Sequence, residues 1–290
     1  MASGPCSWSV REPTAGAPRG IVMVIAAGGW FSGPALVDPG SSDLLSRYVV
    51  HSSQVWRDAG FATVAVEHTS GVVGLASGQL VRGLGKVGFG NVVGWYDLIR
   101  YYADVLYGTA SPVCVAGGSS AGNFALMLAT VRLPSCVATE GAPTQLQLAL
   151  AGDGNPNWAY ATNAFAPIAS GETLARNLGI FSPAFYPAPY FTTTPILMGH
   201  LADDPVVPAA QMGYLADGRP AIESYLMQPS DLANPPECDQ PLAGNDRYLD
   251  RTVAHLCDGS RPGLRQHGVA AATVDTWRER ETQLANRVAP

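Results

Sequence analysis

A cluster of glycine and serine residues near the middle of the chain has the residue types and spacing to do chemistry. It reads Gly118-Ser119-Ser120-Ala121-Gly122, between an apolar run at 113–116 and a breaker-free apolar run at 124–128. A strand, a tight turn and a helix form the context in which Gly-x-Ser-x-Gly becomes a nucleophile elbow. The pattern predicts Ser120 on the strained corner, with an exposed hydroxyl at the helix N-terminus, and Ser119 pointing away from the active face. A small-residue turn that only packs a helix onto a sheet is the alternative.

Together with three other motifs, this stretch resembles the α/β-hydrolases of the serine esterase and lipase type. The other motifs are Gly28-Gly29-Trp30 after an apolar run, Asp-Pro-Val-Val-Pro at 204–208, and His267-Gly268 late in the chain. The resemblance extends from about residue 19 to the C-terminus. It implies an α/β fold with a mostly parallel central sheet flanked by helices, a cap insertion, and a triad in the order Ser, acid, His.

The resemblance implies Asp204 as the triad acid. Counting back from Val207 and Pro208 in the family pattern Asp-x-x-Val-Pro gives Asp204. Counting forward from the end of the preceding apolar run favours Asp203 instead. Glu140, at the end of another expected strand, is a third candidate.

Two histidines follow the candidate acids, His255 and His267. His267 precedes a glycine and a long terminal helix, as the catalytic histidine of the family does. We therefore expect His267 to take the proton of Ser120 during attack and return it to the leaving alcohol. Asp204 would hold the imidazole in the required tautomer. His200 lies too close to its own strand end for this role and is expected to be structural.

The resemblance also implies an oxyanion hole. Its donors would be the backbone N–H groups of Ala121 and of Gly29 or Trp30. Ala27 stands where the family has a histidine, which removes the side-chain hydrogen bonds that normally brace this loop. The residues expected to border the substrate pocket are Trp30, Ser119, Glu140 and Trp158.

The elements that would position these residues follow from apolar runs and helical spacing. Strands are expected over 21–26, 61–66, 113–116, 135–139, 195–198 and 221–227, with an edge strand at 7–11. Helices are expected over 43–59, 95–106 and from the region after His267 to Arg287. The order strand, helix, strand requires crossovers and hence a parallel sheet.

The whole chain, 1–290, is expected to form one α/β-hydrolase domain. It would carry an N-terminal extension at 1–19, a cap-like insertion at 143–191 rich in aromatic residues, and a late loop insertion at 228–263. The segment 83–88 matches Gly-x-Gly-x-x-Gly but does not directly follow a strand, so a loop near the active face is the favoured interpretation.

The bulk composition limits the partners. The net charge of −6 argues against nucleic acid, and no apolar run reaches the roughly 20 residues that span a bilayer. No Cys-x-x-Cys or His/Cys cluster suggests a metal, and no cofactor is expected. The first residues lack the features of a signal peptide, which favours a cytoplasmic protein, or a secreted one if the chain has been trimmed.

Of the five cysteines, Cys114 and Cys136 fall in expected buried strands and are interpreted as small hydrophobic residues. Cys238 and Cys257 bracket a late loop and are the candidates for a disulfide, with Cys6 free or competing for one of them.

These observations predict a serine hydrolase that cleaves carboxylic esters through an acyl-enzyme, with small-molecule (aryl or acyl) or polymeric ester substrates. Two alternatives use the same scaffold. One is a non-hydrolytic enzyme of secondary metabolism, such as a lyase, acyltransferase or cyclase. The other is a catalytically silent ligand-binding relative, which the replacement at Ala27 leaves open.

Overall fold

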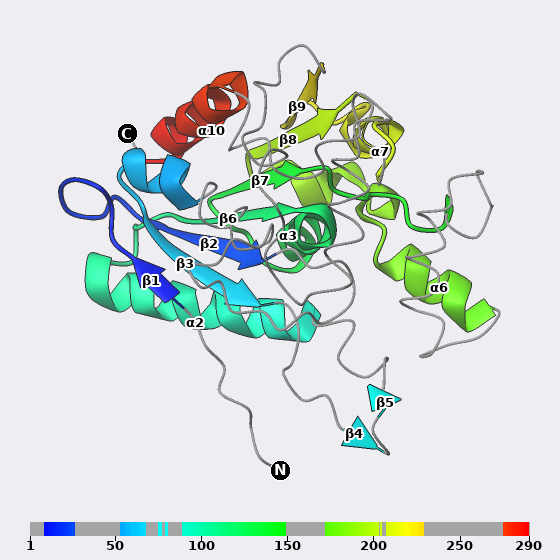
Figure 1. The fold of residues 1–290 in the computed structure, drawn as a ribbon, viewed down its shortest axis with the longest axis horizontal. Helices are drawn as coiled ribbons and strands as arrows, with labels where there is room; N and C mark the ends of the chain where they lie inside the picture. The colour runs from blue at the N-terminus through cyan, green and yellow to red at the C-terminus, as the bar shows by residue number, and fades with distance from the viewer. Residues whose placement is uncertain are drawn as a thin grey trace, which may run out of the picture.

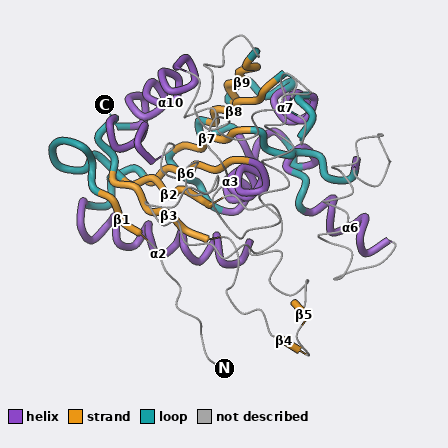
Figure 2. Tube along the Cα trace, in the orientation of Figure 1, coloured by secondary structure: helices purple, strands orange, loops and turns teal. Residues whose placement is uncertain are grey.

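The computed structural model describes residues 9–26, 53–67, 75–76, 79–80, 89–148, 172–202, 204, 207–228 and 275–289. A sheet of seven strands runs through the centre of the molecule, with helices around it (Figures 1 and 2). Its strand order is β1-β3-β2-β6-β7-β8-β9. Only the pair β1 and β3 is antiparallel; the other neighbours in this sheet run parallel.

The strands of this sheet are β1 Ser9–Arg11, β2 Ile21–Ala26, β3 Ala62–Glu67, β6 Val113–Gly118, β7 Cys136–Glu140, β8 Ile196–Leu201 and β9 Ile222–Met227. Every residue of β6, β7 and β8 is buried. Their sequences are mostly apolar because a parallel sheet covered on both faces has no solvent-facing side. A separate antiparallel pair consists of β4 Leu75–Ala76 and β5 Gln79–Leu80.

The described helices are α2 Phe89–Tyr107, α3 Ser119–Val131, α6 Glu172–Ile180, α7 Ala210–Ala216 and α10 Asp275–Val288, with 3-10 turns η2 Pro183–Phe185 and η3 Ala188–Phe191. Residues 53–58 are also helical. Within the part of the chain that the structure describes, none of the helices combines the length and the apolar content needed to cross a bilayer.

The helices α3 and α10 lie on opposite faces of the sheet. A Cβ on Gly122 of α3 would lie 3.4 Å from the Cβ of Thr139 in β7. The next residue of β7, Glu140, accepts a hydrogen bond from the indole N–H of Trp277 in α10. Because side chains alternate along a strand, Thr139 and Glu140 point to opposite faces.

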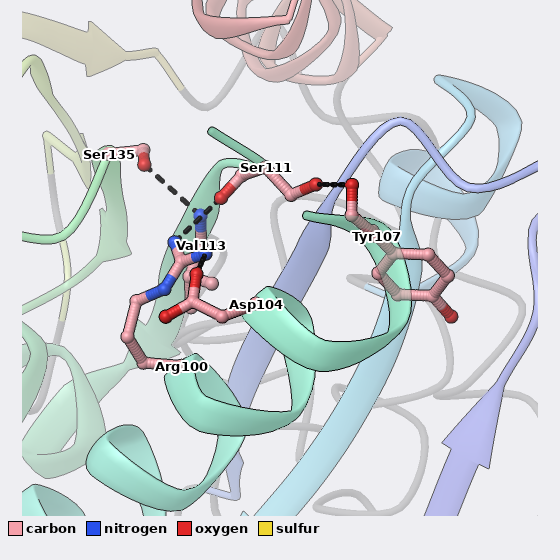
Figure 3. Close-up of polar contacts among 6 residues, drawn as sticks. All are labelled: Arg100, Asp104, Tyr107, Ser111, Val113 and Ser135. Atoms are coloured by element: carbon pink, nitrogen blue, oxygen red, sulfur yellow. Dashed lines mark hydrogen bonds and ion pairs between the residues drawn. The ribbon is translucent and has the colours of Figure 1, made fainter. Parts of the chain in front are cut away.

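Hydrogen bonds tie the end of α2 to the strand that leads into the serine cluster (Figure 3). Arg100 pairs with Asp104 and donates to the Ser111 carbonyl at 2.6 Å, while the Ser111 hydroxyl donates to the Tyr107 carbonyl at 2.8 Å. At the start of β6, the Val113 N–H donates to the Ser135 hydroxyl at 3.1 Å. These contacts join α2, β6 and the turn before β7 into one unit.

The expected strands are confirmed to within a few residues at their ends, and so is the terminal helix. The helix expected over 95–106 starts earlier, at Phe89, so residues 89–94 are helical where the sequence predicts a loop. Residues 53–58 confirm the end of the helix expected over 43–59, whose remaining positions lie largely outside the described residues. Of the expected cap, the structure describes 143–148 and 172–191, and its role stays a prediction.

The interpretation of two cysteines was wrong. Cys114 and Cys136 are register partners on β6 and β7, with Cα atoms 4.6 Å apart, and they form a disulfide. The two residues are 22 positions apart in the chain, so the pairing emerges only when the strands come together. Cys6, Cys238 and Cys257 lie outside the described residues.

Candidate active site

The carboxyl ends of three neighbouring strands meet at one edge of the sheet. Gly118 of β6 is the register partner of Glu140 in β7, and Glu140 is that of Gly199 in β8. In open parallel sheets, the loops beyond these strand ends form the ligand crevice. The residues that directly follow β6 and β8 are therefore the candidates for chemistry.

The corner between β6 and α3 is strained at Ser119. Ser119 has φ 54° and is the only non-glycine residue with positive φ among those described. Such a conformation costs on the order of 1–3 kcal/mol and persists where the surrounding structure imposes it. Ser119 is half-buried, whereas Ser120 is 1% exposed within the first turn of α3. This corrects the expectation that Ser120 occupies the strained corner with an exposed hydroxyl.

The close approach of strand and helix is also centred on Ser119. A Cβ on Gly117 would lie 2.7 Å from the carbonyl carbon and oxygen of Ala121. These are backbone atoms that cannot move aside, so only glycine fits two residues before Ser119. Ala121, two residues after Ser119, is fully buried. The strained turn between β6 and α3 thus lies one position earlier than expected.

The candidate acid Asp204 is held in place just beyond β8. It is 8% exposed, and its Oδ1 accepts a hydrogen bond from the Val207 N–H at 2.9 Å. Its own N–H donates to the Leu201 carbonyl at 3.2 Å. A hydrogen bond from a backbone N–H favours the charged form of a carboxyl group.

His200 is a buried residue of β8 that helps to shape this loop. Its Nε2 lies 2.8 Å from the Val207 carbonyl oxygen and 3.8 Å from Oδ2 of Asp204. The first distance is that of a hydrogen bond and the second is too long for one. The ring therefore connects β8 to the residue that holds Asp204, in agreement with the structural role expected for it.

Comparisons with known proteins give a fold. No protein-family model and no curated protein matches the sequence. An esterase from Pyrobaculum calidifontis superposes with a TM-score of 0.58 at 15% identity, over 99% of this chain and 81% of the other. Carboxyl esterase 2 from Tuber melanosporum superposes with a TM-score of 0.56 at 14% identity, over 98% and 81%. This chain has the α/β-hydrolase fold.

A third solved structure agrees with this fold. A truncated carbohydrate esterase from gut microbiota superposes with a TM-score of 0.56 at 14% identity, over 84% of this chain and 87% of the other. In the α/β-hydrolase fold, the nucleophile elbow joins a strand to a helix and the acid comes later in the chain. Ser119 and Asp204 have these relative positions.

Glu140, the alternative acid expected from the sequence, turns toward α10. Its Oε1 accepts the Trp277 indole N–H at 3.0 Å, and Glu140 is 2% exposed. Glu281, one turn further along α10, is 1% exposed and accepts the Trp56 indole N–H at 3.3 Å. Burial, together with the negative charge of Glu140, raises the pKa of Glu281 well above its usual value, and the Trp56 hydrogen bond opposes this shift only in part.

The first turns of α3 are joined to the expected cap. Asn123 is fully buried, and its Nδ2 donates to the carbonyls of Pro143 at 2.8 Å and Phe181 at 2.9 Å. The Phe181 ring lies 6.5 Å from that of Phe124 and 6.1 Å from that of Phe89. These aromatic residues pack against each other next to the elbow helix, a cluster that the sequence did not reveal.

Several predicted site residues fall outside the part of the chain that the structure describes. Gly29, Trp30, Trp158, Asp203, His255 and His267 lie outside the described residues. Within the described ranges, His, Cys, Asp and Glu side chains do not gather in a group of three or more that could hold a metal ion. The described part of the site thus consists of a strained serine at a helix N-terminus and a buried carboxyl group beyond the last strand but one.

Proposed function

We propose that this chain is a serine hydrolase that cleaves carboxylic esters through an acyl-enzyme, with Ser119 as its nucleophile. The observation that carries the proposal is the φ of 54° at Ser119, at the junction of β6 and α3. In a nucleophile elbow, this strained turn presents the hydroxyl at the carboxyl edge of the sheet. Ser120, buried in the first turn of the helix, is less suited to attack a substrate.

The chemistry needs a base, an acid and an oxyanion hole. His267 would remove the proton from the Ser119 hydroxyl as its oxygen attacks the ester carbonyl, and would return that proton to the departing alcohol. Water, activated by the same histidine, would then release the acid product. Asp204 would orient the imidazole and stabilise its charged form.

The oxyanion donors shift with the nucleophile. The residue after the nucleophile supplies one N–H, so this donor becomes Ser120 in place of Ala121. The second N–H would come from Gly29 or Trp30, as expected from the sequence. The first N–H groups of a helix also carry positive potential, which favours a developing negative charge at this point.

The choice of ester hydrolysis rests on the similar solved structures. They are named as an esterase, a carboxyl esterase and a carbohydrate esterase. Fold alone does not determine the reaction, so the substrate class must be measured. Aryl, acyl and polymeric esters are all candidates.

The test is the rate of hydrolysis of p-nitrophenyl acetate, butyrate and octanoate by the wild type, Ser119→Ala and Ser120→Ala. We expect Ser119→Ala to lose turnover by on the order of 10⁴-fold or more, because the nucleophile is absent. Ser120→Ala keeps its backbone N–H and should lose no more than about 10-fold. A circular dichroism spectrum for each variant controls for folding.

Two outcomes would contradict the proposal. If Ser119→Ala hydrolyses esters normally and Ser120→Ala does not, the nucleophile is Ser120. If the folded wild type is inert on all esters, the esterase assignment fails. Adding methanol or ethanol to active enzyme separates hydrolysis from acyl transfer, because a transferase would give mainly the new ester.

A further inference from the structure

The helix α2 has an apolar face that the described chain leaves exposed. The large apolar residues on this face are 38 to 63% exposed: Leu98 38%, Tyr101 62%, Tyr102 40%, Val105 62% and Leu106 63%. They repeat at helical spacing, and the exposed glycines Gly90 and Gly94 extend the same row toward the N-terminus. We call the seven residues the α2 outer face. The helix runs along the margin of the molecule (Figure 1).

The opposite face of α2 is apolar as well. Val92, Tyr96, Ile99 and Ala103 are buried in the core against the sheet. A helix that is apolar on all sides is normally buried on all sides, whereas a surface helix has a polar outer face. The α2 outer face therefore has the composition of a contact surface.

The charged residues of α2 are engaged within the chain and leave the outer face without an ionic group. Asp97 pairs with Arg132 at 2.7 Å. Arg100 pairs with Asp104 and donates to the Ser111 carbonyl (Figure 3). A partner with a strongly charged surface would find no counter-charge on the outer face. An apolar partner surface fits better.

The two glycines need an explanation. A Cβ on Gly90 or on Gly94 would meet nothing within 4 Å, so neither residue is required by packing among the described residues. Glycine inside a helix costs about 1 kcal/mol relative to alanine. Small residues on a helix surface permit the close approach of another helix. Because both glycines lie on the α2 outer face, large side chains of a partner helix would fit against this end of the face.

We propose that the α2 outer face binds the same face of a second copy of this chain, with the two helices antiparallel and crossing at Leu98. The row of every fourth residue reads Gly90, Gly94, Leu98, Tyr102, Leu106. In an antiparallel pair centred on Leu98, Tyr102 of one copy faces Gly94 of the other, and Leu106 faces Gly90. The bulky half of each row fills the shallow half of its partner, as ridges fill grooves in helix packing.

The available area is sufficient for a weak dimer. The exposed surface of the five large residues amounts to roughly 500 Å² per copy, so a pair that covered all of it would bury about 1,000 Å², the lower limit of specific interfaces. A two-fold contact of this kind is isologous and closes on itself, so it gives dimers and no larger assemblies. We therefore infer a concentration-dependent monomer–dimer equilibrium.

The test is sedimentation velocity of the full chain between about 1 and 200 µM, a range suited to a small interface. We expect the weight-average mass to rise from one chain to two. Val105→Asp should abolish the rise, because it would bury an unpaired carboxylate in the interface. The control Tyr214→Asp, at a 44% exposed position on α7, should behave as the wild type.

A second variant tests the antiparallel register. A Cβ at Gly94 would meet nothing within 4 Å among the described residues. Gly94→Leu adds apolar surface, yet it should weaken the dimer at least 10-fold because its side chain would collide with Tyr102 of the other copy. Unspecific hydrophobic association would instead increase. A wild type that stays monomeric throughout, a dimer insensitive to Val105→Asp, or a dimer strengthened by Gly94→Leu would overturn the proposal.

Discussion

The backbone of Ser119 is held in a conformation that residues with a Cβ rarely adopt. The strand and the helix approach each other closely at this turn, since a Cβ on Gly117 would lie 2.7 Å from the backbone of Ala121. Strain of this kind persists where the surrounding structure imposes it, and it is concentrated at active sites. At Ser119 the side chain so presented is a hydroxyl at the N-terminus of a helix, where developing negative charge is stabilised.

The candidate acid gives a prediction at the same scale. Asp204→Ala should lower kcat on p-nitrophenyl esters by on the order of 10³ to 10⁴-fold, because the histidine would lose its orienting carboxylate. The variant also leaves the Val207 N–H without the acceptor that Asp204 provides. A modest loss of thermal stability should accompany the loss of activity.

The neighbouring carboxylate is the matched control. Asp203→Ala should keep turnover within about 10-fold of the wild type if Asp204 is the acid. Loss of activity in Asp203→Ala together with an active Asp204→Ala would transfer the role to Asp203.

The serine cluster shows which features of the candidate site a residue pattern can predict and which it cannot. The sequence pattern predicts a tight turn between a strand and a helix, which is where β6 and α3 meet. It favours Ser120 as the nucleophile, because only the frame 118–122 has glycine at both ends. The frame centred on Ser119 ends in Ala121, whose single methyl group fits in the fully buried space. This methyl group takes the frame centred on Ser119 out of the Gly-x-Ser-x-Gly pattern, although the strained φ lies at Ser119. Asp204, in contrast, follows from the family pattern Asp-x-x-Val-Pro, and its role as the acid stays a prediction beside Asp203 and Glu140.

At the scale of elements, α10 is fixed to the sheet by buried polar contacts as well as by packing. The Trp277 ring lies so close to Gly199 that a Cβ there would be 2.4 Å from it. The carboxyl groups of Glu140 and Glu281 form a buried polar layer here. Glu140 accepts a hydrogen bond from the indole of Trp277, and Glu281 accepts one from the indole of Trp56. The arrangement favours a neutral Glu281, because a second charge beside Glu140 would be costly.

This layer gives a pH prediction. Because the pKa of Glu281 is raised in the folded state, its contribution to stability is present at low pH and is lost as pH rises through the folded-state pKa. Glu281→Gln keeps the shape and the neutral state, so the alkaline fall of the melting temperature should become less steep. The measurement is a series of thermal melts from about pH 5 to pH 10, the range above the usual pKa of glutamate.

Glu223→Gln is the control for this effect. Glu223 is a partly exposed residue of β9 that pairs with Arg280 at 2.7 Å and Arg287 at 3.0 Å. Glu223→Gln should leave the alkaline fall of the melting temperature as steep as in the wild type. An equally steep slope in Glu281→Gln would show that another group governs the alkaline loss.

The elements themselves differ in how well the sequence predicts them. Strands such as β2 and β8 were found because a run of apolar residues between turns has few other interpretations in a covered parallel sheet. The start of α2 was missed because Gly90 and Gly94 are typical of loops. Helical geometry there is imposed by the core contacts of Val92 and Tyr96 on the other side of the helix.

For the whole molecule, the pattern of alternating strands and helices predicted a parallel sheet, but the pairing of strands is a tertiary property. The disulfide between Cys114 and Cys136 illustrates this difference. In the sequence, both cysteines lie within apolar runs and are interpreted as small buried residues. Only the register of β6 and β7 brings them together. The strand order also decides which loops share an edge, and hence that Ser119 and Asp204 belong to one candidate site.

The central claim is that Ser119 is the nucleophile, and covalent labelling tests it most directly. The wild-type enzyme would be treated with an alkyl fluorophosphonate, in which the attacking serine oxygen bonds to phosphorus as fluoride leaves. Fragmentation of the labelled peptide between positions 119 and 120 then locates the adduct. We predict one adduct, on Ser119, with loss of esterase activity in proportion to labelling. An adduct on Ser120, or full inactivation without an adduct on Ser119, would contradict the claim.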